Sequence, residues 1–225
     1  TAFFNMLSGY SEPPAWNRLV VAPIWLRKTF LRLIEREKEY AKAGKEAHII
    51  AKMNSLCDQE IIAALYEASA CGVKIELLVR GICCLKVGIP GISENISVRS
   101  IVGNYLEHSR IFCFENSGKP EFYCGSADWM PRNLERRVEI LFPVEQENLK
   151  EKLMHILKTE LDDTRKAHNL QADGSYTKAK KVKKVINSQD IFCEEAIRLA
   201  KETLEGTEEA DVQVTRRFIP EQHIN

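Results

Sequence analysis

The sequence predicts an α/β domain in which a mixed sheet is flanked by helices and followed by a helical extension. Three observations favour this class: a strand–helix rhythm over residues 19–79, four further short strands up to residue 142, and charged helical segments beyond Pro143. Strands that are joined through a helix pair in parallel, which gives the sheet its core. The 225 residues, of which 44% are hydrophobic, are enough to bury such a core.

Two strand–helix units open the predicted domain. Pro23 suits a first helical turn, Gly44 suits the left-handed residue that ends a helix, and Asp58 suits an N-cap. The elements expected from these signals are a strand over 19–22, a helix to about Ala43, a strand over 48–52, a helix over 58–71 and a strand over 73–79.

The second half of the sequence changes rhythm. Asn116–Lys119 carries a hairpin signal between two strands, and Pro143 is expected to stop the last strand. The expected elements are an irregular loop over 81–91, strands over 98–102, 110–115, 122–125 and 137–142, a charged helix over 146–167, a Lys-rich stretch over 178–184, an amphipathic helix over 188–204, and a polar, frayed end over 205–225.

Composition excludes several classes of function. Lys and Arg number 32 and Asp and Glu also number 32, so a general nucleic-acid binder is excluded and any anion site must be local. The seven Cys form no C-x-x-C pair, which favours reduced thiols in a cytoplasmic protein. No apolar run approaches the roughly 20 residues of a membrane span. The opening residues, TAFFNMLSGYSEPP, suggest a piece of a longer chain.

Two strand ends carry candidate anion-binding side chains. Arg80 follows a predicted parallel strand, and Gly81 allows close approach of a ligand to the backbone. Lys52 and Asn54 follow the preceding strand beside the N-terminus of a helix, which is a natural place for an anion. A surface Arg before a turn glycine, and an ordinary polar β–α turn, are the plain structural alternatives.

A second group surrounds His108. The spacing His108-x-Arg110 places both side chains on one face of an extended strand. Across the hairpin, Gly125 and Ser126 would leave room for a ligand, Ser126 could donate to a phosphate, and Asp128 could orient His108 or Arg110. The alternatives are a strand-edge His bonded to a neighbour, and a strand end where Trp129 fills the core.

A third group is the run Arg132-Asn133-Leu134-Glu135-Arg136-Arg137, where three Arg cannot all neutralise one another. Residues 80–137 hold six Arg but two Lys, and Arg suits bidentate phosphate contact. Together the groups favour phosphoryl or phosphodiester chemistry. The sequence has neither a P-loop nor a kinase glycine loop.

The pattern His108-x-Arg110 followed by Gly125-Ser126-x-Asp128 resembles the H-x-K…G-S-x-N pattern of phospholipase D-like folds, with Arg for its Lys and Asp for its Asn. More specifically, the segments LLVRGICCL, ISENISVRSIVGNYLEHSRIF and SADWMPRNLERRVEI look like the C-terminal domain of bacterial polyphosphate kinase. The resemblance covers about residues 20–143 closely and the later helices more loosely.

This resemblance implies reversible transfer of the terminal phosphate of ATP to inorganic polyphosphate, with Mg²⁺ and a phosphohistidine intermediate. It implies that Arg80, His108 and Arg137 bind ATP phosphates and that His108 is catalytic. The residue patterns described above place Lys52, Asn54, Arg110, Ser126 and Asp128 in support. The phosphorylated His and most of the metal site would lie in the preceding phospholipase D-like domain, so we expect no metal ligand here and little activity from this chain alone.

The implied organisation is a tail of the preceding domain over 1–17, a catalytic domain over 18–204 with its sheet core to about 143, and a polar tail over 205–225. Implied partners are ATP or ADP, polyphosphate, the preceding domains and further copies of the chain, but no nucleic acid. The location would be cytoplasmic, with the inner membrane face as an open variant. A dimerising phospholipase D-like phosphodiesterase and a polyanion-binding module that uses Lys178–Lys184 are the alternatives.

Overall fold

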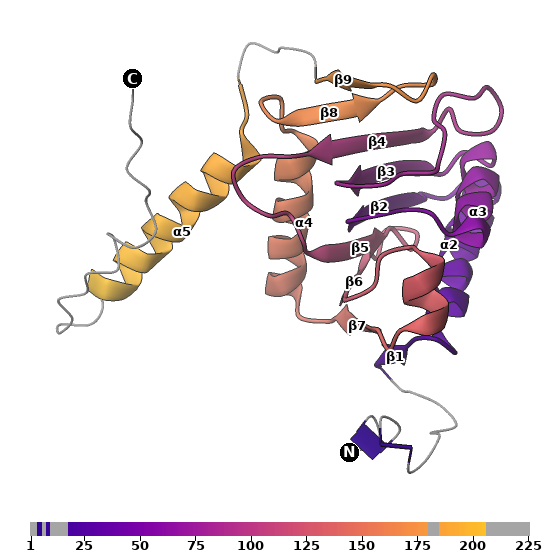
Figure 1. Ribbon diagram of the computed structural model, residues 1–225, viewed down its shortest axis with the longest axis horizontal. Helices are drawn as coiled ribbons and strands as arrows, with labels where there is room; N and C mark the ends of the chain where they lie inside the picture. The colour runs from indigo at the N-terminus through magenta and orange to yellow at the C-terminus, as the bar shows by residue number, and fades with distance from the viewer. Residues whose placement is uncertain (1–3, 6–7, 10–17, 180–184, 206–225) are drawn as a thin grey trace. The chain divides into compact units, whose positions relative to one another are not determined.

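The computed structural model describes residues 4–5, 8–9, 18–179 and 185–205 (Figure 1). The chain divides into two compact units, Thr1–Asn187 and Ser188–Asn225. The second unit contains α5 (Ser188–Glu205). Among the described helices, none is both long and apolar enough to cross a membrane. The expectations for 1–17 and 205–225, and that for the Lys-rich stretch, fall almost entirely outside the described residues.

One mixed sheet forms the centre of the first unit. Its order is β1-β7-β6-β5-β2-β3-β4-β8-β9, in which β2, β3 and β4 are parallel and the other neighbours are antiparallel. The strands are β1 (Val20–Val21), β2 (His48–Met53), β3 (Lys74–Val79), β4 (Ile96–Ile101), β5 (Arg110–Phe114), β6 (Glu121–Gly125), β7 (Ile140–Val144), β8 (Ala167–Leu170) and β9 (Tyr176–Lys178).

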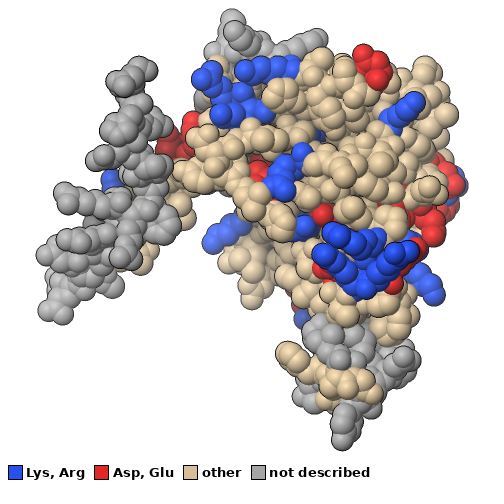
Figure 2. Space-filling view, in the orientation of Figure 1, with Lys and Arg blue, Asp and Glu red and all other residues tan. Residues whose placement is uncertain are grey.

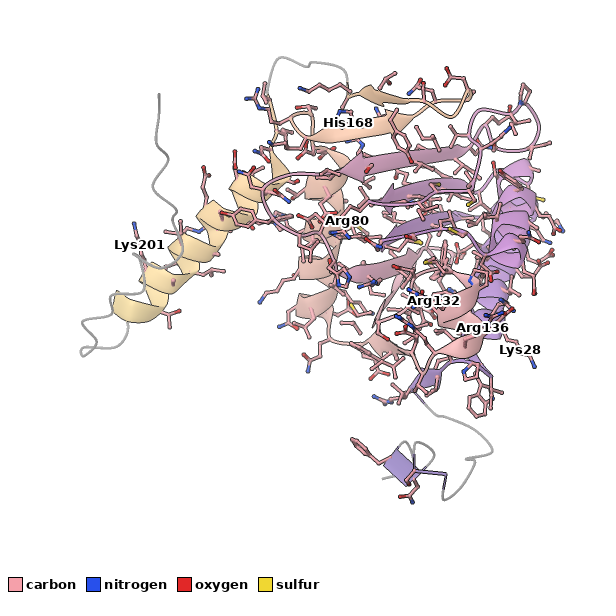
Figure 3. The ribbon with its side chains drawn as sticks, viewed as in Figure 1. Lys28, Arg80, Arg132, Arg136, His168 and Lys201 are labelled. Atoms are coloured by element: carbon pink, nitrogen blue, oxygen red, sulfur yellow. The ribbon has the colours of Figure 1, made fainter. Side chains whose placement is uncertain are left out.

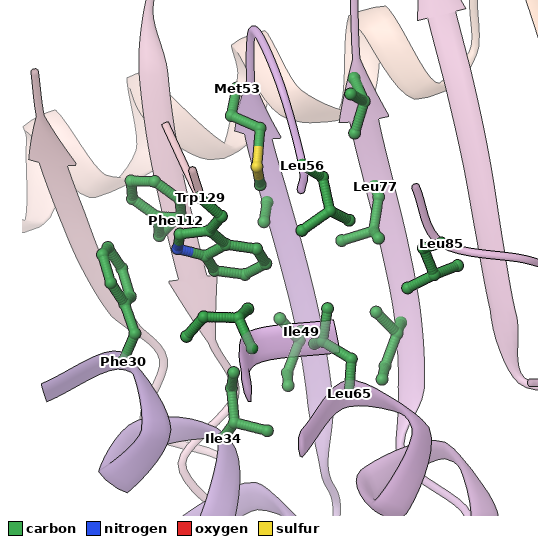
Figure 4. Close-up of a cluster of buried hydrophobic side chains, with 14 of the residues drawn as sticks. Phe30, Ile34, Ile49, Met53, Leu56, Leu65, Leu77, Leu85, Phe112 and Trp129 are labelled. Carbon is green, nitrogen blue, oxygen red and sulfur yellow. The ribbon is translucent and has the colours of Figure 1, made fainter. Parts of the chain in front are cut away.

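Helices α2 (Leu26–Lys42) and α3 (Gln59–Ala70) cover one face of the sheet, as Figure 1 shows. The aromatic centre of this layer is Phe30, Phe112 and Trp129, which are fully buried and have ring centroids 4.7–5.4 Å apart. Figure 4 shows these rings beside the aliphatic side chains of β2 and β3. Trp129 therefore fills the core, which confirms the plain structural prediction for this residue.

Helix α4 (Glu147–Leu161) covers the opposite face. Leu157 is fully buried there against Ile50, Leu78 and Ile111, which point away from the α2–α3 layer because side chains alternate along a strand. Both faces of the central strands are thus covered, which explains their nearly continuous apolar sequences.

Several local predictions are confirmed. Helix α2 ends at Lys42, and Gly44 has a φ of +68°. Asp58 caps α3, where its carboxylate accepts the N–H of Ile61 at 3.1 Å. The turn between β5 and β6 places Asn116, Ser117 and Gly118 at positive φ, which the hairpin signal requires.

Other predictions were wrong in detail. The charged helix ends at Leu161 instead of residue 167, because the Asp163 carboxylate accepts the N–H groups of residues 165, 166 and 167 at 2.7–3.1 Å and turns the chain.

The sheet continues past residue 143 with β8 and β9. Pro143 lies within β7, and β1 pairs with β7 in antiparallel orientation at the sheet edge, so only one of the two predicted β–α units feeds the parallel core. Pro23 lies in a turn before α2.

We predict that Phe112→Ala lowers the free energy of unfolding by about 3–5 kcal/mol, because it removes the ring between Phe30 and Trp129. The measurement is urea unfolding followed by circular dichroism. Phe142→Ala is the matched control, since 42% of Phe142 is exposed. Equal losses for the two variants would contradict the assignment of the core.

Candidate functional site

The Asp128 carboxylate joins three separate segments at the end of β6. Only 4% of Asp128 is exposed. One carboxylate oxygen accepts the backbone N–H of Asn54 at 2.8 Å and the Nε–H of Arg110 at 3.0 Å, and the other accepts from Nη2 of Arg110 at 3.3 Å. A bidentate contact fixes the plane of a guanidinium as well as its position. Asp128 therefore sets the orientation of Arg110.

Arg110 in turn holds His108. Its Nη1 lies 2.9 Å from Nδ1 of His108 and donates to the carbonyl oxygen of His108 at 2.6 Å. A guanidinium is always protonated and cannot accept a hydrogen bond, so Nδ1 must be the acceptor and a neutral imidazole must carry its hydrogen on Nε2. Because His108 is exposed, the Nε2–H group is accessible to a ligand.

The hairpin register brings the two sequence patterns together. Arg110 lies directly opposite Gly125, so Asp128 returns beside the start of β5. Ser126 differs from the expectation, because its hydroxyl donates to the buried carboxylate of Glu139 and accepts the N–H of Ile140 at 3.1 Å. Its single donor hydrogen is already in use within the fold.

Arg80 follows β3 and is partly exposed. Among the described residues, no carboxylate forms an ion pair with its guanidinium. Arg80 lines a cavity of about 10 Å³, room for roughly one water molecule, and Glu107 lines the same cavity. Because Glu107 directly precedes His108, the loop that carries His108 lies beside Arg80.

The two glycines of the predicted site serve packing instead of ligand approach. The N–H of Gly81 donates to the carbonyl oxygen of Asn54 at 2.7 Å, and a Cβ at Gly81 would lie 2.9 Å from that oxygen. A Cβ at Gly125 would lie 2.5 Å from the carbonyl oxygen of Ile140. Both positions require glycine because backbone segments cross there.

Lys52 is not available to a phosphate. Its side chain is 3% exposed, and Nζ contacts Glu107 at 2.6 Å and Glu160 at 2.5 Å. The sequence predicts that Lys52 supports an anion site directly, but its ammonium group instead contacts the carboxyl groups of Glu107 and Glu160 within the fold. Asn54 contributes its backbone N–H to Asp128, and its Oδ1 is buried without a partner in the described part of the chain.

The Arg-rich run forms a short π-helical turn, Arg132–Arg136, followed by Arg137. All three Arg are exposed. The nearby carboxylates are engaged elsewhere: Glu135 pairs with Arg27 at 2.6 Å, and Glu139 accepts from Ser126 and Asn133. Figures 2 and 3 show Arg132 and Arg136 gathered with Lys28 in a basic region apart from Arg80. Arg137, to which the family resemblance gives an ATP-binding role, directly follows this turn.

All seven cysteines are free. Within the described ranges, no three His, Cys, Asp or Glu side chains are arranged to hold a metal ion. Sequence reasoning missed Glu107, Glu139 and Glu160, which neutralise or orient the polar groups beneath the site, because their partners are close only in the folded sheet.

We predict that Asp128→Ala lowers the free energy of unfolding by about 3–5 kcal/mol, because it leaves the guanidinium of Arg110 partly buried without its partner. Urea unfolding measures the loss, and exposed Asp173→Ala is the control. In a double-mutant cycle, Arg110→Gln should cost much less in the Asp128→Ala background than alone. Additive losses would show that the two side chains do not interact.

Curated relatives of this chain are polyphosphate kinases. The polyphosphate kinase of Parasynechococcus marenigrum is 55% identical over 173 residues, which are 77% of this chain and 24% of that protein. The polyphosphate kinase of Halalkalibacterium halodurans is 50% identical over 202 residues, 89% of this chain and 29% of that protein. The chain thus spans about a quarter of the length of these curated relatives.

Solved structures show the same fold. The crystal structure of polyphosphate kinase from Porphyromonas gingivalis matches with a TM-score of 0.83 at 40% identity, over 92% of this chain and 31% of that one. Nuc from Salmonella typhimurium, a phospholipase D family member, matches 68% of this chain with a TM-score of 0.50 at 15% identity, which shows the phospholipase D-like fold alone. The family "Polyphosphate kinase C-terminal domain 2" matches residues 19–189. The chain therefore belongs to the polyphosphate kinase C-terminal domain family.

Proposed function

We propose that this chain is the C-terminal part of a kinase that reversibly transfers the terminal phosphate of ATP to inorganic polyphosphate. The observation that carries the proposal is the contact series from the Asn54 N–H through Asp128 and Arg110 to His108, which orients the imidazole on a loop whose preceding residue, Glu107, lines the same cavity as Arg80. An oriented hydrogen-bond donor next to an Arg without a carboxylate partner suits a phosphoryl group.

Phosphoryl transfer demands that charge on the three equatorial oxygens be stabilised while donor and acceptor stay in line. In the proposed site, the Nε2–H group of His108 donates to one of these oxygens. Arg80 and Arg137 supply positive charge to the others. Because Arg110 occupies Nδ1, Nε2 is a donor and not a nucleophile, so His108 would stabilise the transferred group instead of carrying it.

The nucleophile is therefore assigned to another domain. The proposed phosphohistidine belongs to the preceding phospholipase D-like domain of a longer protein. Mg²⁺ would supply charge neutralisation at the nucleotide phosphates. Homo-oligomers and a cytoplasmic location are further parts of the proposal.

We predict that Arg80→Gln and His108→Gln each weaken binding of ATP to this chain by about tenfold or more, since each removes a charged or directed contact to phosphate. Isothermal titration calorimetry measures the affinity. Arg18→Gln is the matched control, because Arg18 is exposed and pairs with Glu145 near the β1 edge of the sheet. Equal affinities for all three variants would contradict the placement of the ATP site.

We also predict that the chain alone makes no polyphosphate from ATP, because the proposed nucleophile is absent. In the full-length enzyme, His108→Ala should lower kcat by orders of magnitude, as measured by polyphosphate formation.

Hydrolysis of a model phosphodiester by the chain would favour a phospholipase D-like phosphodiesterase instead. Salt-sensitive polyphosphate binding that survives His108→Ala but is lost when the lysines of 178–184 are replaced would favour a polyanion-binding module.

A further inference from the structure

A buried carboxyl pair lies directly beneath the loop that carries His108. Glu107, Lys52 and Glu160 come from the β4–β5 loop, β2 and α4. The Lys52 ammonium contacts both carboxyl groups, at 2.6 Å and 2.5 Å, and the side chains of Lys52 and Glu160 are each 3% exposed. Two ionised carboxylates held against one ammonium in such a buried place would repel each other, which is costly.

The two carboxyl groups meet at the same ammonium nitrogen, so their oxygens lie close together. Two ionised carboxylates at one site repel each other, which favours a proton on one of them. Glu160 is the more deeply buried of the pair, with a side chain 3% exposed against 17% for Glu107. The proton therefore belongs on Glu160.

Contacts from Lys52 and Arg110 restrain the end of the loop that carries His108. Two charged side chains hold the end of its loop: Arg110 contacts His108 itself, and Lys52 contacts the adjacent Glu107. Most of the preceding loop is exposed, including Val102, Tyr105 and Leu106. The position of Glu107 thus depends on whether the neighbouring carboxyl group of Glu160 is protonated or negatively charged.

We propose that Glu160, acting through Lys52 and Glu107, is a positioning residue for His108 and does so with its carboxyl group protonated. This inference rests on the proposed function only for its consequence, the binding of phosphate at His108. Loss of the Glu160 proton sets the two carboxylates against each other. Glu107 is the less buried of the two, so it moves, and the His108 loop moves with it.

The charged groups around Glu160 support a pH-dependent position of the His108 loop. Burial raises the pKa of Glu160 to about 7, Lys52 lowers it, and Glu107 raises it again. Arg80 and Arg99 line the same cavity from the ends of β3 and β4. Arg99 donates to the carbonyl oxygens of Leu161 and Asp163, so it caps α4 and leaves Lys52 as the direct partner of the carboxyl pair.

The proton on Glu160 also affects the free energy of unfolding. The folded chain holds the Glu160 proton up to pH about 7, whereas the unfolded chain releases it near pH 4.5, the ordinary value. Between these pH values the folded state binds one proton more, so this group makes the free energy of unfolding fall as pH rises. Above pH about 7 both states are ionised and the contribution stays constant.

Backbone amide NMR of this chain tests the proposal. The His108→Gln background removes the imidazole itself, and the amide of Ser109 reports the loop between pH 5.5 and 8.5. We expect a midpoint near pH 7, its loss in His108→Gln/Glu160→Gln, and its persistence in the control His108→Gln/Glu151→Gln, since Glu151 is exposed on the same helix. A flat parent curve, or a midpoint that survives Glu160→Gln, overturns the proposal.

A second variant covers the case in which Glu160→Gln fails to fold. Glu107→Gln removes the negative charge that raises the pKa of Glu160, so the Ser109 midpoint should move to lower pH; an unchanged midpoint overturns the proposal. ATP titrations at pH 6.5 and 8.5 separate the two proposals. Absence of ATP binding at both pH values would refute the proposed function while the amide midpoint still reports the carboxyl pair. If the unsubstituted chain binds ATP, it should bind ATP more weakly at pH 8.5 than the Glu160→Gln variant does.

Discussion

The Asp128–Arg110 ion pair is the contact on which the arrangement of the site depends. Asp128 is buried at the end of β6 and also accepts the N–H of Asn54, so the ends of β2 and β6 and the start of β5 share one carboxylate. A buried charge of this kind is tolerated only when its hydrogen bonds are satisfied. Satisfying them fixes Arg110, and Arg110 fixes the ring and the carbonyl group of His108.

The zero net charge of the chain conceals two different uses of its cations. Lys52 and Arg110 are held by carboxylates and shape the floor of the site. Arg80 and Arg137 form no ion pair with a described carboxylate, and they follow β3 and the π-helical turn. A locally cationic surface can therefore stand on a neutral chain, because the balancing carboxylates lie beneath the site.

Local signals made much of the fold predictable. The cap at Asp58, the glycine after α2 and the hairpin at Asn116–Lys119 act within a few residues, and the hairpin register alone places Arg110 opposite Gly125. The partners of Lys52 lie 55 and 108 residues away, so no pattern along the chain could show that its charge is used internally. The expected helix ran to about residue 167, but the Asp163 carboxylate turns the chain after Leu161, and the sequence did not predict the short strands β8 and β9.

The two departures from the phospholipase D-like pattern, Arg110 and Asp128, form an ion pair in the structure, so they act as one paired change. A Lys at position 110 would present a single point charge, and an Asn at position 128 would present one carbonyl oxygen. Arg and Asp together make a bidentate ion pair, and the fork leaves Nη1 for His108. The paired change gives the imidazole a permanent donor at Nδ1, which disfavours a histidine nucleophile and suits a histidine that binds the transferred group. The same geometry thus accounts for both the altered pattern and the proposed division of labour between the domains.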